Sequence, residues 1–247
     1  MTRLIEPLTR CVECPLRTLD AFRQCTPDPD FMQAMKAGEM MRNPGETIIP
    51  EGETVSNLYT MLSGWAFRYK TLPDGRRQIF GYSVAGDLVG LQASMLDAMS
   101  HGVEALTPVV LCVFPRERFW SVSERHPSIA YDVTWLSARE EHALEEALLS
   151  IGRRSALERT AFFLWYIFDK GRTAGLTHEQ SLLLPVTQTH IADTLGQSLV
   201  HTNKTLQKLR TTGVASLEDR LLRVHDEDAL LRIAKIERTP PRGRPLL

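Results

Sequence analysis

The sequence predicts an α+β protein in which an N-terminal β-roll is followed by a long amphipathic helix and a C-terminal winged helix-turn-helix. Three observations predict this order. Short apolar segments broken by turn residues run from about Thr47 to Pro115, a pattern typical of a β-barrel or jelly roll. After Pro127 the apolar residues recur at steps of three and four, which indicates a helix. Two short helical segments joined by a glycine-containing turn follow between Thr187 and Thr211.

Length and composition exclude several classes of protein. A chain of 247 residues with 43% hydrophobic and 24% charged residues can bury a sizeable core, unlike a disordered chain or a disulfide-stapled miniprotein. The longest apolar runs, Val109–Phe114 and Phe162–Phe168, are far shorter than the roughly 18 residues that cross a bilayer. The N-terminus has no signal-peptide segment, so we expect a cytoplasmic protein without a membrane partner. Because the net charge is only −1, any anion-binding surface must be local.

The β-roll is placed at residues 27–126, after an N-terminal cysteine segment at residues 1–26. Pro73, Asp74 and Gly75 supply a tight turn between two strand-like runs, and further glycines punctuate the other strands. An open α/β sheet is the alternative interpretation of these glycines. It is disfavoured because no helical period of ten or more residues separates the strands.

A long helix is expected at Ser128–Ile151, in a segment assigned to residues 127–152. Its stripe, in which the polar Glu140 fills one step, consists of Ile129, Val133, Leu136, Glu140, Ala143, Ala147 and Ile151. Such a stripe needs a partner, and the pattern leaves two open: the helix's own domain, or a parallel coiled-coil seam with a second subunit. Glutamates clustered on this helix, Glu146 among them, form either a solvated face or a site where one points at its own copy. A further helical segment is expected at Arg153–Phe168.

A helix-turn-helix is the most informative part of the sequence, in a domain placed at residues 153–235. Thr187 is expected to cap a helix at Gln188–Leu195. After a turn at Gly196 and Gln197, Ser198 is expected to cap a second helix at Leu199–Thr211. The residues expected to face inward are Ile191, Leu195, Leu199, Leu206 and Leu209.

The second of these helices has a polar and basic outward side. The residues expected on it, with the capping serine, are Ser198, Val200, His201, Asn203, Lys204, Gln207 and Lys208. No Asp or Glu occurs between Asp193 and Glu218, so a positive surface is expected where phosphates would bind. Because Asn suits adenine and Lys suits guanine in the major groove, these residues form a predicted site for double-stranded DNA.

A helical hairpin with a solvated lysine face is the alternative. Residues 214–226 weaken it, because they have the pattern of a two-stranded wing and precede a short helix at Glu227–Ile233. A winged helix-turn-helix is typical of DNA-binding proteins. The chain then ends in a basic, Pro-rich tail at residues 236–247, which is expected to be disordered.

The order of these parts resembles that of the Crp/Fnr family of bacterial transcription regulators, and so do the segments Val84–Leu91, Val109–Val122 and Thr189–Gly213. The resemblance implies a jelly roll like those that bind cyclic nucleotides, in a regulator that is not an enzyme. It also implies a homodimer that binds a pseudo-palindromic promoter site, with RNA polymerase as a partner. On this interpretation the stripe of the long helix, together with Glu146, is the dimer interface.

The resemblance also bears on the effector. Cyclic AMP is not expected, because no Arg or Lys occurs between Arg77 and Arg116 to pair with its phosphate. Leu91 stands where the cyclic-nucleotide branch of the family has a ribose-binding Glu. Met99 lies about where that branch has a phosphate-binding Arg.

The Fnr branch of the family instead holds an oxygen-labile four-iron four-sulfur cluster on four cysteines. The resemblance implies this cluster here, with Cys11, Cys14, Cys25 and Cys112 as its ligands. Ten residues separate Cys14 from Cys25, more than in cluster-binding relatives. The alternatives are a cluster-free regulator with a thiol switch or no effector, and a zinc site on the same thiolates.

The helix that would read DNA departs from Fnr proper. Val200, Asn203 and Lys204 stand where Fnr presents Glu, Ser and Arg. Since a valine cannot accept a hydrogen bond from cytosine, the Fnr operator sequence is not expected.

An enzyme of the cupin type is the competing class, because a β-roll can hold catalytic metals. Such a site needs clustered histidines and carboxylates on neighbouring strands. His101 stands alone in the predicted roll, which favours the regulator.

Overall fold

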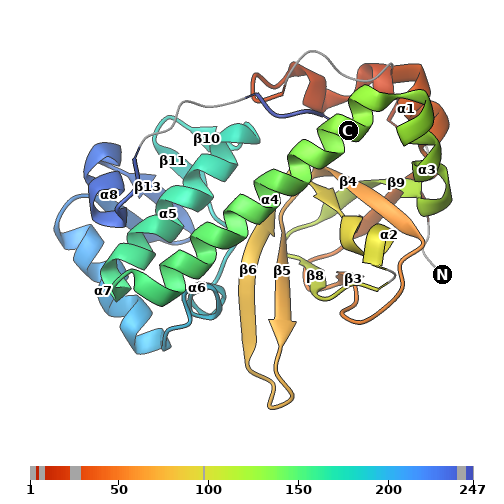
Figure 1. Cartoon of the computed structure of the whole chain (residues 1–247). Helices are drawn as coiled ribbons and strands as arrows, with labels where there is room; N and C mark the ends of the chain where they lie inside the picture. Colours follow the sequence, from red (N-terminus) through yellow and green to blue (C-terminus); the bar gives the residue numbers. More distant parts are fainter. Residues whose placement is uncertain (1–3, 6–8, 23–28, 97, 238–242, 247) are drawn as a thin grey trace. The chain divides into compact units, whose positions relative to one another are not determined.

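The computed structural model of the chain describes residues 4–5, 9–22, 29–96, 98–237 and 243–246 (Figure 1). The chain divides into two compact units, and neither is continuous in sequence. The first comprises residues 1–70, 82–141 and 242–247, and the second comprises residues 71–81 and 142–241. The second unit therefore includes the tip of a β-hairpin as well as the C-terminal helices.

Two antiparallel sheets form the predicted β-roll. Their strand orders are β1-β2-β9-β4-β7 and β3-β8-β5-β6, so neighbouring strands are mostly distant in sequence, as in a jelly roll. The strands are β1 (Leu4–Ile5), β2 (Gly38–Arg42), β3 (Thr47–Ile49), β4 (Asn57–Ser63), β5 (Ala66–Thr71), β6 (Arg77–Ser83), β7 (Leu88–Val89), β8 (Gly102–Ala105) and β9 (Val109–Pro115). The short helices are η1 (Cys11–Glu13), η2 (Pro15–Thr18), α1 (Pro29–Met35), α2 (Leu91–Leu96) and α3 (Arg116–Arg125).

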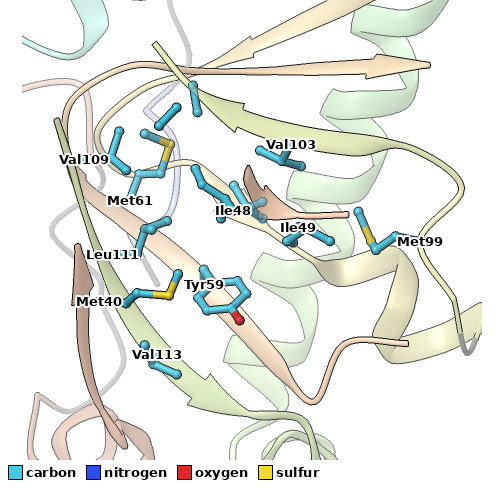
Figure 2. Packing of buried hydrophobic residues seen from close by; sticks show 13 residues of the cluster. Met40, Ile48, Ile49, Tyr59, Met61, Met99, Val103, Val109, Leu111 and Val113 are labelled. Carbon is cyan, nitrogen blue, oxygen red and sulfur yellow. The ribbon is translucent and has the colours of Figure 1, made fainter. Parts of the chain in front are cut away.

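The core of the roll is an apolar cluster to which both sheets contribute (Figure 2). Side chains alternate along a strand, so Leu111 and Val113 of β9 join this cluster while Cys112, between them, faces the other way. Cys112 is nevertheless buried. Another part of the chain therefore covers the second face of the sheet at this cysteine.

The helix α4 (Pro127–Arg153) has 27 residues and confirms the predicted long helix. Ile129, Val133 and Leu136, the first part of its stripe, are buried in the single chain. Of the two partners that the pattern left open, the chain itself thus covers this part. Further along, Ile151 is exposed and Leu148, which the stripe did not include, is 74% exposed.

The second unit holds the C-terminal helices and a four-stranded sheet in the order β10-β11-β13-β12. Its elements are α5 (Ala156–Thr173), β10 (Thr177–His178), β11 (Ser181–Leu183), α6 (Gln188–Leu195), α7 (Leu199–Thr211), β12 (Ala215–Glu218), β13 (Leu221–Val224) and α8 (Glu227–Ala234). The helix predicted from Arg153 begins at Ala156 instead, because Ser155 and Glu158 form a capping box there. In the described ranges, no helix combines the length and the apolar content that crossing a membrane requires.

The prediction of a disordered C-terminal tail is wrong for residues 243–246. Arg244, Pro245 and Leu246 are buried, and they belong to the first unit. A basic, Pro-rich composition indicates disorder only when the charges have no partner in the fold, and Arg244 has one in Asp87. Residues 238–242 and Leu247 lie outside the described part of the chain.

Two turn glycines allow a test of the roll. Both Gly64 and Gly75 have a φ near +90°, but a Cβ on Gly64 would lie 2.3 Å from the carbonyl oxygen of Pro108, whereas a Cβ on Gly75 would meet nothing within 4 Å. We expect Gly75→Ala to lower the free energy of unfolding by about 1 kcal/mol through backbone strain alone. Gly64→Ala should lower it by about 3 kcal/mol, because the backbone must also move. Urea unfolding measures both, and equal losses would contradict the packing at Gly64.

Candidate nucleic-acid interface and cysteine site

Local capping signals position the two helices of the predicted helix-turn-helix. The side chain of Thr187 accepts a hydrogen bond from the backbone N–H of His190 at 3.2 Å, and the ring of His190 accepts one from the N–H of Thr187. Burial lowers the pKa of His190, which favours the neutral ring that this contact needs. Gly196 ends α6 in the left-handed conformation with φ +60°, and Ser198 caps α7 through the N–H of His201. The predicted bounds of both helices are confirmed.

The inward face of the pair differs from the prediction at one leucine. Leu199 is 45% exposed, because it lies in the first turn of α7, before the helix reaches its neighbours. Thr202 and Thr205 are buried in its place. The hydroxyl of Thr205 is hydrogen-bonded to that of Thr160 on α5, with 2.9 Å between the oxygens. A hydrophobic pattern could not reveal the buried position of Thr205, because its partner lies on another helix.

The outward face of α7 has the composition that the sequence predicts. Ser198, Val200, His201, Asn203, Lys204, Gln207 and Lys208 are all exposed. Residues three, four and seven apart share one face of a helix, so Val200, Asn203, Lys204 and Gln207 form one surface. The described structure thus leaves this surface open to a large polar ligand.

Acidic neighbours of this surface are paired with basic groups. The guanidinium of Arg77 contacts the carboxylate of Asp193 through both Nε and Nη2, each at 3.0 Å. Glu218 pairs with Arg210 at 2.6 Å. The negative charges at either end of the acid-free stretch are therefore offset, at the expense of Arg210 of α7, while Lys204 and Lys208 keep their positive charge on the exposed side of the helix.

Two contacts from the hairpin tip hold α6. Besides the Arg77 pair, the side-chain amide of Gln78 donates a hydrogen bond to the carbonyl of Thr194 at 3.0 Å. Both residues belong to the second unit together with α6. The sequence gives no indication of these contacts, because no local signal relates residues more than a hundred positions apart.

The wing supplies two exposed cations in addition to those predicted on α7. The strands β12 and β13 form a hairpin whose tip, Asp219 and Arg220, has positive φ values. Arg220 and Arg223 are exposed. Their position in the predicted wing, at residues 214–226, is the sequence signal that could have identified them as candidate phosphate contacts.

The cysteine site lies on the face of the sheet opposite the core. Cys112 in β9 is paired in register with Glu39 of β2 and with Thr60 of β4. Cys11 and Cys14, in and after η1, are half-buried, and the N–H of Cys11 donates to the side chain of Gln33 at 2.9 Å. All three are free thiols. Cys25, the other predicted ligand, lies outside the described residues.

A buried ion pair organises this site. Lys36 Nζ lies 2.6 Å from Glu39 Oε1, and the two side chains are 1% and 4% exposed. Lys36 also donates to the carbonyl oxygen of Thr9, while the N–H of Thr9 donates to Glu39. The pair therefore fixes the N-terminal cysteine segment over the sheet. Two charges in a sequence cannot reveal that both are buried.

The thiols beside this pair are protonated at neutral pH. Burial raises the pKa of Cys112 to about 12 against the opposing effect of Lys36, and burial likewise raises that of Cys11. Thiolates are the ligands that iron and zinc require. The donor type thus fits a metal or cluster, but among the described residues no three His, Cys, Asp or Glu side chains are grouped to hold a metal.

The histidine of the roll does not form a metal group either. Burial, together with Arg68 and Lys70, lowers the pKa of His101 to about 4, so its ring is neutral at pH 7. In the part of the chain that the structure describes, His101 belongs to no set of three candidate ligands. These residues therefore give no support to a cupin-type centre.

Comparison with known proteins agrees with a β-roll joined to a helix-turn-helix. Residues 42–126 match the family described as "Cyclic nucleotide-binding domain", and residues 158–233 match the "Crp-like helix-turn-helix domain". The chain is 30% identical over 216 residues to the transcriptional activatory protein AadR of Rhodopseudomonas palustris, covering 85% of this chain and 89% of AadR. It is 29% identical to the nitrogen fixation regulation protein FixK of Bradyrhizobium diazoefficiens, covering 95% of each.

The structure of FixK2 from Bradyrhizobium japonicum has a similar fold. The TM-score is 0.72 at 25% identity, and the match covers 82% of this chain and 98% of FixK2. The fold and the exposed second helix define a transcription regulator with a DNA-binding helix-turn-helix. The chain belongs to the Crp/Fnr family.

The buried pair at Lys36 gives a testable expectation. Lys36→Met should lower the free energy of unfolding by about 3–5 kcal/mol, because it leaves a buried carboxylate unpaired. The double variant Lys36→Met/Glu39→Leu removes both charges and should regain most of the loss. Against the opposing effect of burial, the hydrogen bond to Glu39 raises the pKa of Lys36 above its ordinary value of 10.5. The stabilisation by the ion pair should therefore be complete below about pH 10 and should be lost as the pH rises through the pKa of Lys36 in the folded protein. Urea unfolding measures these values, and a double variant no more stable than the single one would contradict the pairing.

Proposed function

We propose that this regulator binds a specific, pseudo-palindromic promoter site as a homodimer in the cytoplasm, with RNA polymerase as its partner. The observation that carries the proposal is the exposed surface of α7, in which Asn203 and Lys204 stand among other exposed polar and basic side chains. Two such helices fit successive major grooves about 34 Å apart. A homodimer supplies both.

Base recognition is assigned to three residues of α7. Asn203 suits adenine, Lys204 suits guanine, and the apolar Val200 suits the methyl group of thymine. His201, Gln207 and Lys208 are assigned to base edges or phosphates nearby. Arg220 and Arg223 of the wing are assigned to the phosphate backbone, which fixes register without reading sequence.

The dimer seam is assigned to the second half of α4. Leu144, Leu148 and Ile151 recur at steps of four and three and are exposed, so a second copy can bury them with Ala143 and Ala147. Ile129, Val133 and Leu136 support the helix from within the chain instead. Two acidic residues of the predicted interface also have partners in the chain, since Glu146 pairs with Arg154 and Glu140 with Arg68.

Two substitutions test recognition of DNA on a site selected from random sequence. Lys204→Ala should weaken binding to that site by about 1–3 kcal/mol, and Asn203→Ala should relax base preference at one position. Lys235→Ala, which removes an exposed charge outside α7, is the control. Binding is measured by titration of labelled duplex. An equal loss on selected and random duplex would show that these residues contact phosphate only.

We further propose that the cysteines make the regulator responsive to oxygen or redox state. The support is that the buried Cys112 is paired in register with Glu39, the partner of Lys36, while Thr9 ties the segment that carries Cys11 and Cys14 to the same ion pair. With Cys25 they supply the four thiols that a [4Fe–4S] cluster uses. Cyclic AMP is left out of the proposal, because no Arg or Lys occurs between Arg77 and Arg116 to pair with its phosphate and Met99 is part of the apolar core.

An anaerobic preparation tests the sensing group. We expect broad absorption near 400 nm that bleaches in air, with iron and sulfide in equal amounts, and loss of both in Cys112→Ser. Ser is the matched replacement because it keeps the size of the side chain. A colourless, iron-free anaerobic preparation that still binds its promoter would contradict the cluster. It would leave a thiol switch, a zinc site or an effector-independent regulator.

A further inference from the structure

The last described residues of the chain, 243–246, form what we call the C-terminal strap. The backbone N–H of Arg244 donates to the carbonyl of Ala21 at 3.0 Å, and Arg244 forms a parallel bridge with Phe22. The strap therefore lies beside the end of the described N-terminal cysteine segment. Its arginine is only 2% exposed.

The arginine of the strap has three kinds of contact in its site. Its Nη2 lies 2.8 Å from Asp87 Oδ1 and also donates to the carbonyl oxygen of Gly86. Its guanidinium carbon lies 4.9 Å from the centre of the Phe22 ring, within the range of a cation–π interaction. Since a buried guanidinium is costly without an anion, Asp87 makes this site selective for a cation.

The opposite wall of the site is held rigidly by the roll. The second oxygen of Asp87 accepts a hydrogen bond from the N–H of Val84 at 2.8 Å. The N–H of Gly86 donates to Met61 of β4, and the N–H of Met61 donates to Asp87. The turn that carries the carboxylate is thus held by contacts that do not involve the arginine.

Gly86 is shaped for this arrangement. Its φ is +83°, and a Cβ at this position would lie 2.1 Å from the ring of Phe22. Phe22 can therefore pack on the turn only because residue 86 is glycine. The turn, the aromatic ring and the arginine therefore form one site. The proposed binding of DNA by α7 does not require this site.

Two runs of backbone hydrogen bonds, which meet at the neighbouring residues Leu16 and Arg17, lie between this site and the thiols. Phe22 is bonded to Leu19 and Leu19 to Leu16, each through the N–H of the later residue. In the same way Arg17 is bonded to Cys14, and Cys14 to Cys11. The turns that carry the two thiols therefore end at the residue against which the strap lies.

We propose that the first unit contains a binding site for an arginine-containing peptide, formed by Phe22, Gly86 and Asp87, and that the chain's own C-terminus fills it. Occupation of this site holds the turns of Cys11 and Cys14 in place. A ligand that binds one arrangement of a segment stabilises that arrangement. The strap thus controls how readily the N-terminal thiols change conformation, whatever chemistry they carry.

Hydrogen exchange in the full-length, metal-free, reduced protein tests the proposal. In Arg244→Ala the amides of residues 9–22 should exchange about tenfold faster, since they lose the contacts that close the segment. Asp87→Asn, which keeps an oxygen for the N–H of Val84, should have the same effect. Arg232→Ala, an exposed arginine of α8, is the control and should change nothing. The amides of β9 report whether the roll itself remains intact.

Two results would overturn the proposal. One is unchanged exchange of residues 9–22 in both variants, and the other is equal acceleration of β9, which would mean general loosening. Restoration completes the test: the free peptide Gly-Arg-Pro-Leu-Leu, added in excess to Arg244→Ala, should return exchange of residues 9–22 toward the wild-type rate. The peptide with Ala in place of Arg should not. Failure of the first peptide would show that the site does not bind an arginine peptide.

Discussion

The buried ion pair of Lys36 and Glu39 is the interaction on which the arrangement of the N-terminal segment over the β-roll depends. Alternation along β9 places Cys112 on the face of the sheet that the core does not use. That face would be open to water if the N-terminal segment did not cover it, and the segment is attached by the contacts of Thr9 with both members of the pair. The ion pair and the buried thiol of Cys112 are therefore neighbours. Any group that binds Cys112 as a thiolate must displace its proton beside the positive charge of Lys36 and the negative charge of Glu39.

The helix-turn-helix domain could be predicted from the sequence in more detail than the β-roll and its N-terminal cysteine segment. The signals for α6 and α7 are local: Thr187, Gly196 and Ser198 act on backbone groups within a few residues of themselves. The outward residues of α7 follow from helical periodicity once its ends are known. Local signals stop being sufficient where packing decides, and for this reason Leu199 is exposed while Thr202 and Thr205 are buried.

What the sequence could not reveal depends on contacts between distant segments. Lys36 and Glu39 appear as two ordinary charges, and the basic tail resembles a solubilising end. Only the fold shows that Arg244 meets Asp87, more than a hundred and fifty residues earlier. The segment Val84–Leu91 indicates the family but not the contacts of Gly86 and Asp87 with the C-terminal strap, because a glycine in a turn can be required for many different reasons. The stripe of the long helix α4 is a second example, since its periodicity identifies an apolar face but not the part of the protein that covers this face.

The hairpin tip at residues 71–81 has a consequence for any attempt to divide this protein. By contacts it belongs with α6, although its strands continue in the roll. A fragment that starts at α5 would keep both helices of the helix-turn-helix, yet it would lack the guanidinium of Arg77 and the amide of Gln78 that contact the first of them. A single cut therefore cannot separate a complete helix-turn-helix unit from this chain, because the residues of β5 and β6 are divided between the two units.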